Sequence, residues 1–345
     1  MKEKILIIKS KNLSSFENEY VEKVILNKIN HVSYKYLEDL KKKDFLKINK
    51  DFHVIFQVSD VIRNSETFKN IDECSKNLDE FSLIHLGDET LGQSYEFYKN
   101  CKVVLRAYFN PNIKYKNYAI PVGFQSGFKN EKRTKEKKFY KWVFFGQLHN
   151  DRYRIINYLK ALTPNLYQKS ESFMDKNSIS VEKQKEIYQK SMFVICPFGV
   201  INPDTFRIME TLESDSIPII KKFYFTDYFK FIYGDHPFPT VVSWKNASKL
   251  INYYSENKNK YDQLQDDIEE WYINYLNNLT EDIKNLIYGK ENIQSKQFYY
   301  QKAHGRKLSV VFSFWFEFKF KRMKYIYRIN KIILRIYYKI ISLLE

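Results

Sequence analysis

Residues Ser191–Ile220 have the sequence SMFVICPFGVINPDTFRIMETLESDSIPII. The apolar run Met192–Cys196 predicts a short buried strand, and Pro197–Gly199 end it and open a loop. A helix is expected near Thr205–Glu213, and Ile217–Ile220 predicts a second buried strand. A strand, a loop, a helix and another strand in succession indicate the α/β class with a parallel sheet.

Arg207 and Glu210 are the first ligand-binding candidates in this stretch. They are three residues apart, so they share one face of the expected helix, which Asp204 or Thr205 can cap. A helix N-terminus and a guanidinium both attract phosphate oxygens, and a carboxylate one turn deeper can accept hydrogen bonds from a ribose diol. The pattern favours a nucleoside diphosphate site, with an intrahelical Arg207–Glu210 ion pair as the equally weighted alternative.

The same alternation of strands and helices extends along the chain on both sides of a charged segment. This segment, KNEKRTKEKK at Lys129–Lys138, is polar and aperiodic and predicts an interdomain linker. Two doubly wound α/β domains are therefore expected, at 1–128 and 139–295. The expected strands are Lys4–Lys9, His53–Val58, Phe81–Leu86, Val103–Tyr108, Tyr118–Val122, Trp142–Phe145, Met192–Cys196, Ile217–Ile220 and Thr240–Ser243, with further helices at Asp151–Leu162 and 261–290.

Three parts of the chain together resemble the exostosin-type glycosyltransferases. The family's C-terminal motif resembles the segment with Ser191, Pro197–Gly199, Arg207, Glu210 and Ile217–Ile220. The opening of its donor domain is similar to Trp142–Leu159. Acceptor-domain segments of its ribitol-xylosyltransferase branch and bacterial relatives resemble His85–Thr90 and Val103–Pro111. The resemblance covers residues 80–245. One departure puts the C-cap of the helix in doubt, because Ser214, Asp215 and Ser216 stand where members often have a glycine.

This resemblance implies the GT-B architecture, in which two Rossmann-like domains face each other across a cleft. Such enzymes transfer a sugar from a nucleotide donor, usually UDP-linked, and invert the anomeric centre. They typically stabilise the leaving diphosphate with a helix dipole and cations instead of a metal. We therefore expect no metal and no cofactor, which agrees with the lack of a DxD motif at an expected strand end and with three widely separated cysteines.

The resemblance also implies a set of donor-binding residues. They are Arg207 and Arg152 at the diphosphate, Glu210 at the ribose, Gly146 and Gly199 where the backbone approaches the ligand, and Ser191 and Thr205 as further contacts. Two alternatives stay open. Gly146 could be an ordinary turn glycine, and Arg152 could belong to a solvated basic face that it shares with Arg154.

An inverting transfer needs a base that takes the proton of the acceptor hydroxyl. Asp88, and after it Glu89, are the candidates, because both follow the expected strand Phe81–Leu86 at its carboxyl end, where ligands bind in such sheets. Arg106 ends the next strand and could steady the acceptor or the donor phosphate. The alternatives are that Asp88 caps a helix and that Arg106 is an ordinary strand-end cation.

Positive charge is concentrated near the end of the chain. The formal net charge is +16, and residues 301–345 hold 11 Lys and Arg against Glu317 and Glu345, a net of +9. Isoleucines from Ile326 to Ile340 recur every three to four residues and face away from the cations, which predicts an amphipathic helix in a tail at 296–345. We expect this tail to lie on an anionic membrane surface, with a helix packed on the protein or a coiled-coil seam as the alternatives.

These observations lead to one expected function and two alternatives. We expect an inverting glycosyltransferase, peripheral on the cytoplasmic face of the cell membrane, that moves a sugar from UDP to a cell-surface glycan such as lipopolysaccharide, lipooligosaccharide or capsule. The first alternative is a fucosyltransferase-like enzyme with a GDP-sugar donor, although the 200–212 region lacks a Tyr-x-x-Glu-Lys stretch. The second, a nucleic-acid-binding protein, is suggested by the charge and the aromatic content but by no recognisable motif, so no nucleic-acid partner is expected.

Overall fold

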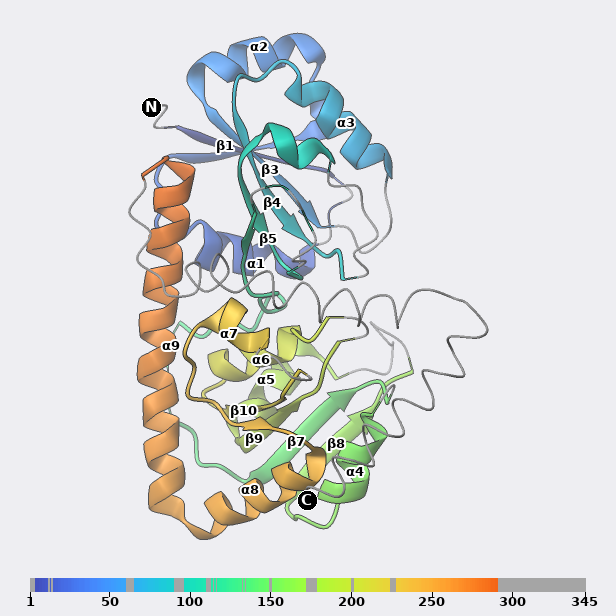
Figure 1. Cartoon of the computed structure of the whole chain (residues 1–345), viewed down its shortest axis with the longest axis vertical. Helices are drawn as coiled ribbons and strands as arrows, with labels where there is room; N and C mark the ends of the chain where they lie inside the picture. Colours follow the sequence, from blue (N-terminus) through green and yellow to red (C-terminus); the bar gives the residue numbers. More distant parts are fainter. Residues whose placement is uncertain are drawn as a thin grey trace. The chain divides into compact units, whose positions relative to one another are not determined.

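The computed structural model describes residues 4–290 except 12, 14, 60–64, 90–95, 110–112, 114, 116, 132, 134, 149–150, 172–178, 200–201 and 224–227. The predicted tail at 296–345 lies outside the described residues. The chain forms two compact units (Figure 1). Unit 1 comprises 4–131, Phe229–His236 and 270–290, and unit 2 comprises Lys132–Tyr228 and Pro237–Glu269. No helix in the described part of the chain is both long and apolar enough to cross a membrane.

Unit 1 is built on a six-stranded, all-parallel sheet with the strand order β2-β1-β3-β4-β5-β6. The central strands are mostly apolar and buried because helices cover a parallel sheet on both faces. In β1, for example, Ile5 to Ile8 are all buried. The strands are β1 Ile5–Lys9, β2 Val32–Tyr36, β3 His53–Ser59, β4 Phe81–Leu86, β5 Cys101–Arg106 and β6 Tyr118–Ala119; the helices are α1 Asn18–Tyr20, which continues as a π-helix over Val21–Ile25, α2 Lys42–Asp51 and α3 Ser65–Ser75.

Unit 2 contains a second parallel sheet, of five strands in the order β11-β10-β9-β7-β8. Its strands are β7 Tyr140–Gly146, β8 Asn165–Lys169, β9 Ser191–Cys196, β10 Ile217–Lys221 and β11 Thr240–Val241; its helices are α4 Tyr153–Leu159, α5 Val181–Gln189, α6 Phe206–Glu213 and α8 Trp244–Glu256, and two further helices, α7 Tyr228–Tyr233 and α9 Lys258–Ile287, have residues in both units. The predicted α/β class with two Rossmann-like sheets is confirmed.

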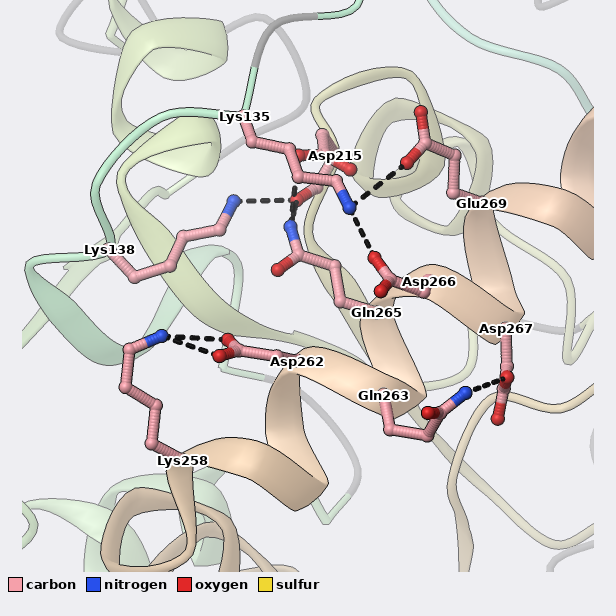
Figure 2. Close-up of polar contacts among 10 residues, drawn as sticks. All are labelled: Lys135, Lys138, Asp215, Lys258, Asp262, Gln263, Gln265, Asp266, Asp267 and Glu269. Atoms are coloured by element: carbon pink, nitrogen blue, oxygen red, sulfur yellow. Dashed lines mark hydrogen bonds and ion pairs between the residues drawn. The ribbon is translucent and has the colours of Figure 1, made fainter.

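The end of the predicted linker is fixed to unit 2 through the turn after α6 (Figure 2). Nζ of Lys138 donates to the carbonyl oxygens of Gln189 and Asp215, at 2.8 and 2.6 Å. Asp215 has φ 52°, the left-handed conformation that a glycine usually provides after a helix. Gln265 on α9 donates to the carbonyl and to the carboxylate of Asp215, at 3.0 and 2.9 Å. These contacts hold Asp215 in the left-handed conformation directly after α6.

Candidate functional site

Gly146 ends β7 at the carboxyl edge of the unit 2 sheet, where parallel α/β sheets bind ligands. Its φ is +142°, a conformation that side chains rarely adopt. A Cβ on this residue would lie 2.3 Å from Nη2 of Arg207, far inside van der Waals contact. Gly146 is therefore required both by its backbone and by the guanidinium beside it, and it is not an ordinary turn glycine.

Arg207 lies in the first turn of α6, and its side chain extends over the end of β7. Nε donates to the carbonyl oxygen of Phe145 at 2.8 Å, and the guanidinium carbon lies 5.5 Å from the centroid of the Phe144 ring. Within the described residues Arg207 forms no ion pair, so the alternative of an intrahelical pair with Glu210 is wrong. Its half-buried guanidinium stays available at the helix N-terminus.

Arg152 joins two loops at the same edge. Its guanidinium donates to the carbonyl oxygen of Phe198, in the loop after β9, and to that of Gln147 at 3.2 Å, in the loop after β7. The residue is 4% exposed, so the alternative of a solvated basic face is wrong. Nη1 would lie 3.8 Å from a Cβ on Gly146, so both predicted arginines reach this glycine. Because the Arg152 guanidinium donates its hydrogen bonds to carbonyls of these two loops, its role is to hold the loops in position.

The loop between β9 and α6 holds two buried polar atoms without a hydrogen-bond partner in the described part of the chain. They are Nδ2 of Asn202 and Oγ1 of Thr205, the N-cap residue of α6. Oδ1 of Asn202 accepts from the hydroxyl of Tyr228 at 2.6 Å, and the carbonyl of Asn202 accepts from the amide of Gly199 at 2.8 Å. Buried polar atoms are nearly always satisfied, so these two point to a ligand-binding loop.

Glu210 lies one turn deeper on α6 and is 3% exposed. Its carboxylate accepts from Nε2 of Gln184 on α5 at 3.4 Å, and the same amide donates to the hydroxyl of Tyr188 at 3.0 Å. Burial raises the pKa of Tyr188, and the negative charge of Glu210 raises it further. The structure thus places the Glu210 carboxylate against α5.

Ser191 does not belong to this cluster. It is the first residue of β9 and pairs with Tyr140, the first residue of β7, whereas Gly146 is the last. Its buried hydroxyl donates to the carbonyl of Ile187 at 2.6 Å. Ser191 therefore lies at the opposite edge of the sheet from Gly146, and its predicted contact with the donor stays a prediction.

One ion pair at the carboxyl edge of the unit 2 sheet was not predicted from the sequence. Lys221 ends β10, and its Nζ pairs with the carboxylate of Asp151, next to Arg152. Both side chains are mostly buried. A charged residue directly after the apolar run Ile217–Ile220 was the available signal.

In unit 1, Asp88 and Arg106 form a buried ion pair. Nη2 of Arg106 lies 2.8 Å from Oδ2 of Asp88, and the two side chains are 0% and 1% exposed. Nη1 of Arg106 donates to the hydroxyl of Tyr98 at 3.0 Å and lies 3.2 Å from Nδ1 of His85, which is inside β4 as predicted. Burial raises the pKa of Tyr98 to about 12. Asp88 and Arg106 are therefore ion-pair partners, and the predicted roles of Asp88 as base and of Arg106 as a ligand-binding cation stay predictions.

Glu89, the second candidate base, is only partly buried, and its amide donates to the carbonyl of Gly87 at 3.0 Å. A different carboxylate at the carboxyl edge of this sheet was missed by the sequence analysis. Glu17 is 4% exposed and accepts a hydrogen bond from Oγ of Ser59, the last residue of β3. A glutamate in the polar segment after β1 has no sequence signal that marks it as buried.

Among the described residues, no three His, Cys, Asp or Glu side chains lie close enough together to hold a metal ion. Cys196 is buried, and Cys74 and Cys101 are partly buried, all as free thiols.

Comparison with solved structures finds the same architecture elsewhere. T4 phage BGT in complex with its UDP-glucose substrate matches with a TM-score of 0.52 and 13% identity, over 85% of this chain and 100% of that one. The DNA-modifying enzyme β-glucosyltransferase matches with a TM-score of 0.52 and 14% identity, over 83% and 98%. The fold is GT-B. No protein-family model and no curated protein matches the sequence.

Proposed function

We propose that this GT-B protein is an inverting glycosyltransferase that binds a UDP-sugar at the carboxyl edge of the unit 2 sheet. One observation carries the proposal: the guanidinium of Arg207, which has no ion-pair partner among the described residues, lies at the N-terminus of α6, directly beside Gly146. A helix N-terminus offers free amides and the positive end of the helix dipole to a phosphate, and a guanidinium matches phosphate oxygens. The solved relatives with this fold include a complex with UDP-glucose.

The neighbouring residues support the same assignment. The unpartnered atoms of Asn202 and Thr205 can bind diphosphate oxygens or donor hydroxyls, and Glu210 is the carboxylate proposed for the ribose. As the bond between the sugar and the diphosphate breaks, negative charge develops on the leaving group, and Arg207 with the dipole of α6 would stabilise it. We propose that the reaction needs no metal ion.

The proposal extends to the acceptor and the location. A cell-surface glycan such as lipopolysaccharide, lipooligosaccharide or capsule is the proposed acceptor, reached by an enzyme on the inner face of the membrane. The basic, isoleucine-rich sequence at 296–345 supports this location, since such segments bind anionic lipid surfaces. The exostosin-type motif supports the reaction class, because its residues Gly146, Arg152 and Arg207 converge in unit 2.

The decisive experiment is thermal unfolding of the full chain with UDP, GDP, CMP and ADP. A ligand at one hundred times its Kd adds about 2.7 kcal/mol to the stability of the state that binds it. UDP should raise the unfolding midpoint, and Arg207→Ala should abolish that rise. Arg154→Ala, an arginine on the nearby helix α4, is the matched control and should keep it.

The other outcomes are equally informative. A shift with GDP alone would establish the GDP-sugar alternative, and no shift with any nucleotide would overturn the proposal. Release of UDP from UDP-sugars then identifies the donor sugar. Binding to anionic vesicles and to DNA, each measured at several salt concentrations, separates the proposed membrane partner from the nucleic-acid alternative.

A further inference from the structure

Glu17 lies where the sheet of unit 1 would bind a ligand. Its Oε2 accepts from Oγ of Ser59, and Ser59 ends β3 beside Leu86, which ends β4. Both strands are parallel, so the Glu17 carboxylate stands at the carboxyl edge of the sheet. The side chain comes from the short helical turn Ser15–Glu17, which follows β1.

Glu17 is an incompletely satisfied buried acid. A carboxylate can accept about four hydrogen bonds, and within the described residues Glu17 accepts only the one from Ser59. Burial raises the pKa of Glu17 to about 7, although the Ser59 hydroxyl lowers it. A buried acid with a perturbed pKa in a ligand-binding position is characteristic of catalytic groups, and a base is most effective when its pKa lies near the working pH.

Two other carboxylates at this edge have different environments. Asp88 is neutralised by the guanidinium of Arg106 at 2.8 Å. Glu38 accepts from Oγ of Ser10 and from the amide of Lys11 at 2.9 Å, and it is not deeply buried. Neither of them is, like Glu17, a buried carboxylate with a single hydrogen bond and no counter-charge among the described residues.

We propose that Glu17 is the general base of the transferase and removes the proton from the attacking acceptor hydroxyl. The inference rests on the proposed function. In the step, the bond from C1 of the sugar to the UDP oxygen breaks while the acceptor oxygen bonds to C1. The electron pair leaves with UDP, and the acceptor proton moves to the Glu17 carboxylate, which later releases it to solvent.

The test measures UDP release from UDP-glucose, UDP-galactose, UDP-xylose and UDP-N-acetylglucosamine in the full chain. The acceptors are water, glycerol and methyl glycosides, with sodium azide as an acceptor that has no proton to lose. Glu17→Gln should lower release with the neutral acceptors by about 100-fold or more. It should keep the UDP-induced rise in the unfolding midpoint and be rescued by azide. Glu38→Gln is the matched control and should release UDP at the wild-type rate.

Each result decides a separate question. Absence of a UDP-induced midpoint rise in the wild type would overturn the proposed function. Release by Glu17→Gln within threefold of the wild type, or a loss that azide does not rescue, would overturn the role of Glu17 alone. The unfolding midpoint of Glu17→Gln at pH 8, compared with that of the wild type, tests the proposal without an activity measurement. A higher midpoint in the variant is expected, because the buried charge of Glu17 costs stability. A lower midpoint would show that the carboxylate has a structural role and would overturn the proposal.

Discussion

Nη2 of Arg207 lies 2.3 Å from the position that a Cβ on Gly146 would take. Arg207 lies in the first turn of α6, and Gly146 ends β7, so the contact joins two elements that are far apart in the sequence. The glycine gives the guanidinium its place at the edge of the sheet, and the carbonyl of Phe145, one residue earlier, holds it there. The position of this cation therefore depends on the absence of a side chain.

Gly146→Ala should abolish UDP binding and lower stability by about 1–3 kcal/mol, since the new methyl group displaces Arg207 and strains a backbone at φ +142°. Urea unfolding and UDP titration measure the two effects. Gly289→Ala is the control, because it also has a positive φ, of +70°, but its Cβ would meet only the end of Lys102, at 3.4 Å. It should lose stability and keep UDP binding; loss of UDP binding in both variants would contradict the specific role of Gly146.

Arg152→Ala should destabilise unit 2 by about 2 kcal/mol, because buried carbonyls lose hydrogen bonds from a charged donor. The affected carbonyls belong to Phe198 and Gln147. Arg207→Ala should change stability little, since the Arg207 side chain makes a single hydrogen bond, to the carbonyl of Phe145, in the described part of the chain. Chemical unfolding of both variants distinguishes a positioning arginine from a binding one, and equal destabilisation would contradict that distinction.

Sequence patterns predicted the central strands because a parallel sheet buries both faces of each. β3, β4 and β10 are mostly apolar and almost fully buried, and they were found within one residue of their bounds. The edge strands β2 (VSYKY) and β8 (NLYQK) were missed, since an edge strand is largely exposed and keeps polar residues. The roles of Arg152, Asp88 and Glu17 could not be separated from the sequence either. They depend on burial and on partners far away in the chain, such as Arg106 for Asp88, Phe198 for Arg152 and Ser59 for Glu17.

Asp88→Asn should lower stability by about 3–5 kcal/mol, because it leaves the Arg106 guanidinium buried without its counter-charge. The double variant Asp88→Asn, Arg106→Met removes both charges and should recover part of that loss. Urea unfolding of the single and double variants measures the coupling between the two residues. Unchanged stability in Asp88→Asn with loss of sugar transfer would favour Asp88 over Glu17 as the base.

Glu17→Gln should instead stabilise the protein, and more so as the pH rises. Burial raises the Glu17 pKa from 4.5 to about 7, so between these values the folded state binds more protons than the unfolded state. Stability from this group therefore falls as the pH rises through that window, by about 3 kcal/mol in full. Glutamine removes the cost and can still accept from Ser59, so the gain should be near zero below pH 4.5 and largest above pH 7. Urea unfolding of the wild type and the variant at pH 4.5, 6 and 8 measures this gain in stability.

Glu38→Gln is the control. Desolvation raises the Glu38 pKa, but the hydrogen bonds from Ser10 and Lys11 lower it more, so the Glu38 pKa is lowered overall. This variant should therefore gain no stability at pH 8. A gain for Glu17→Gln that did not depend on pH would show that the carboxylate is not the group that titrates.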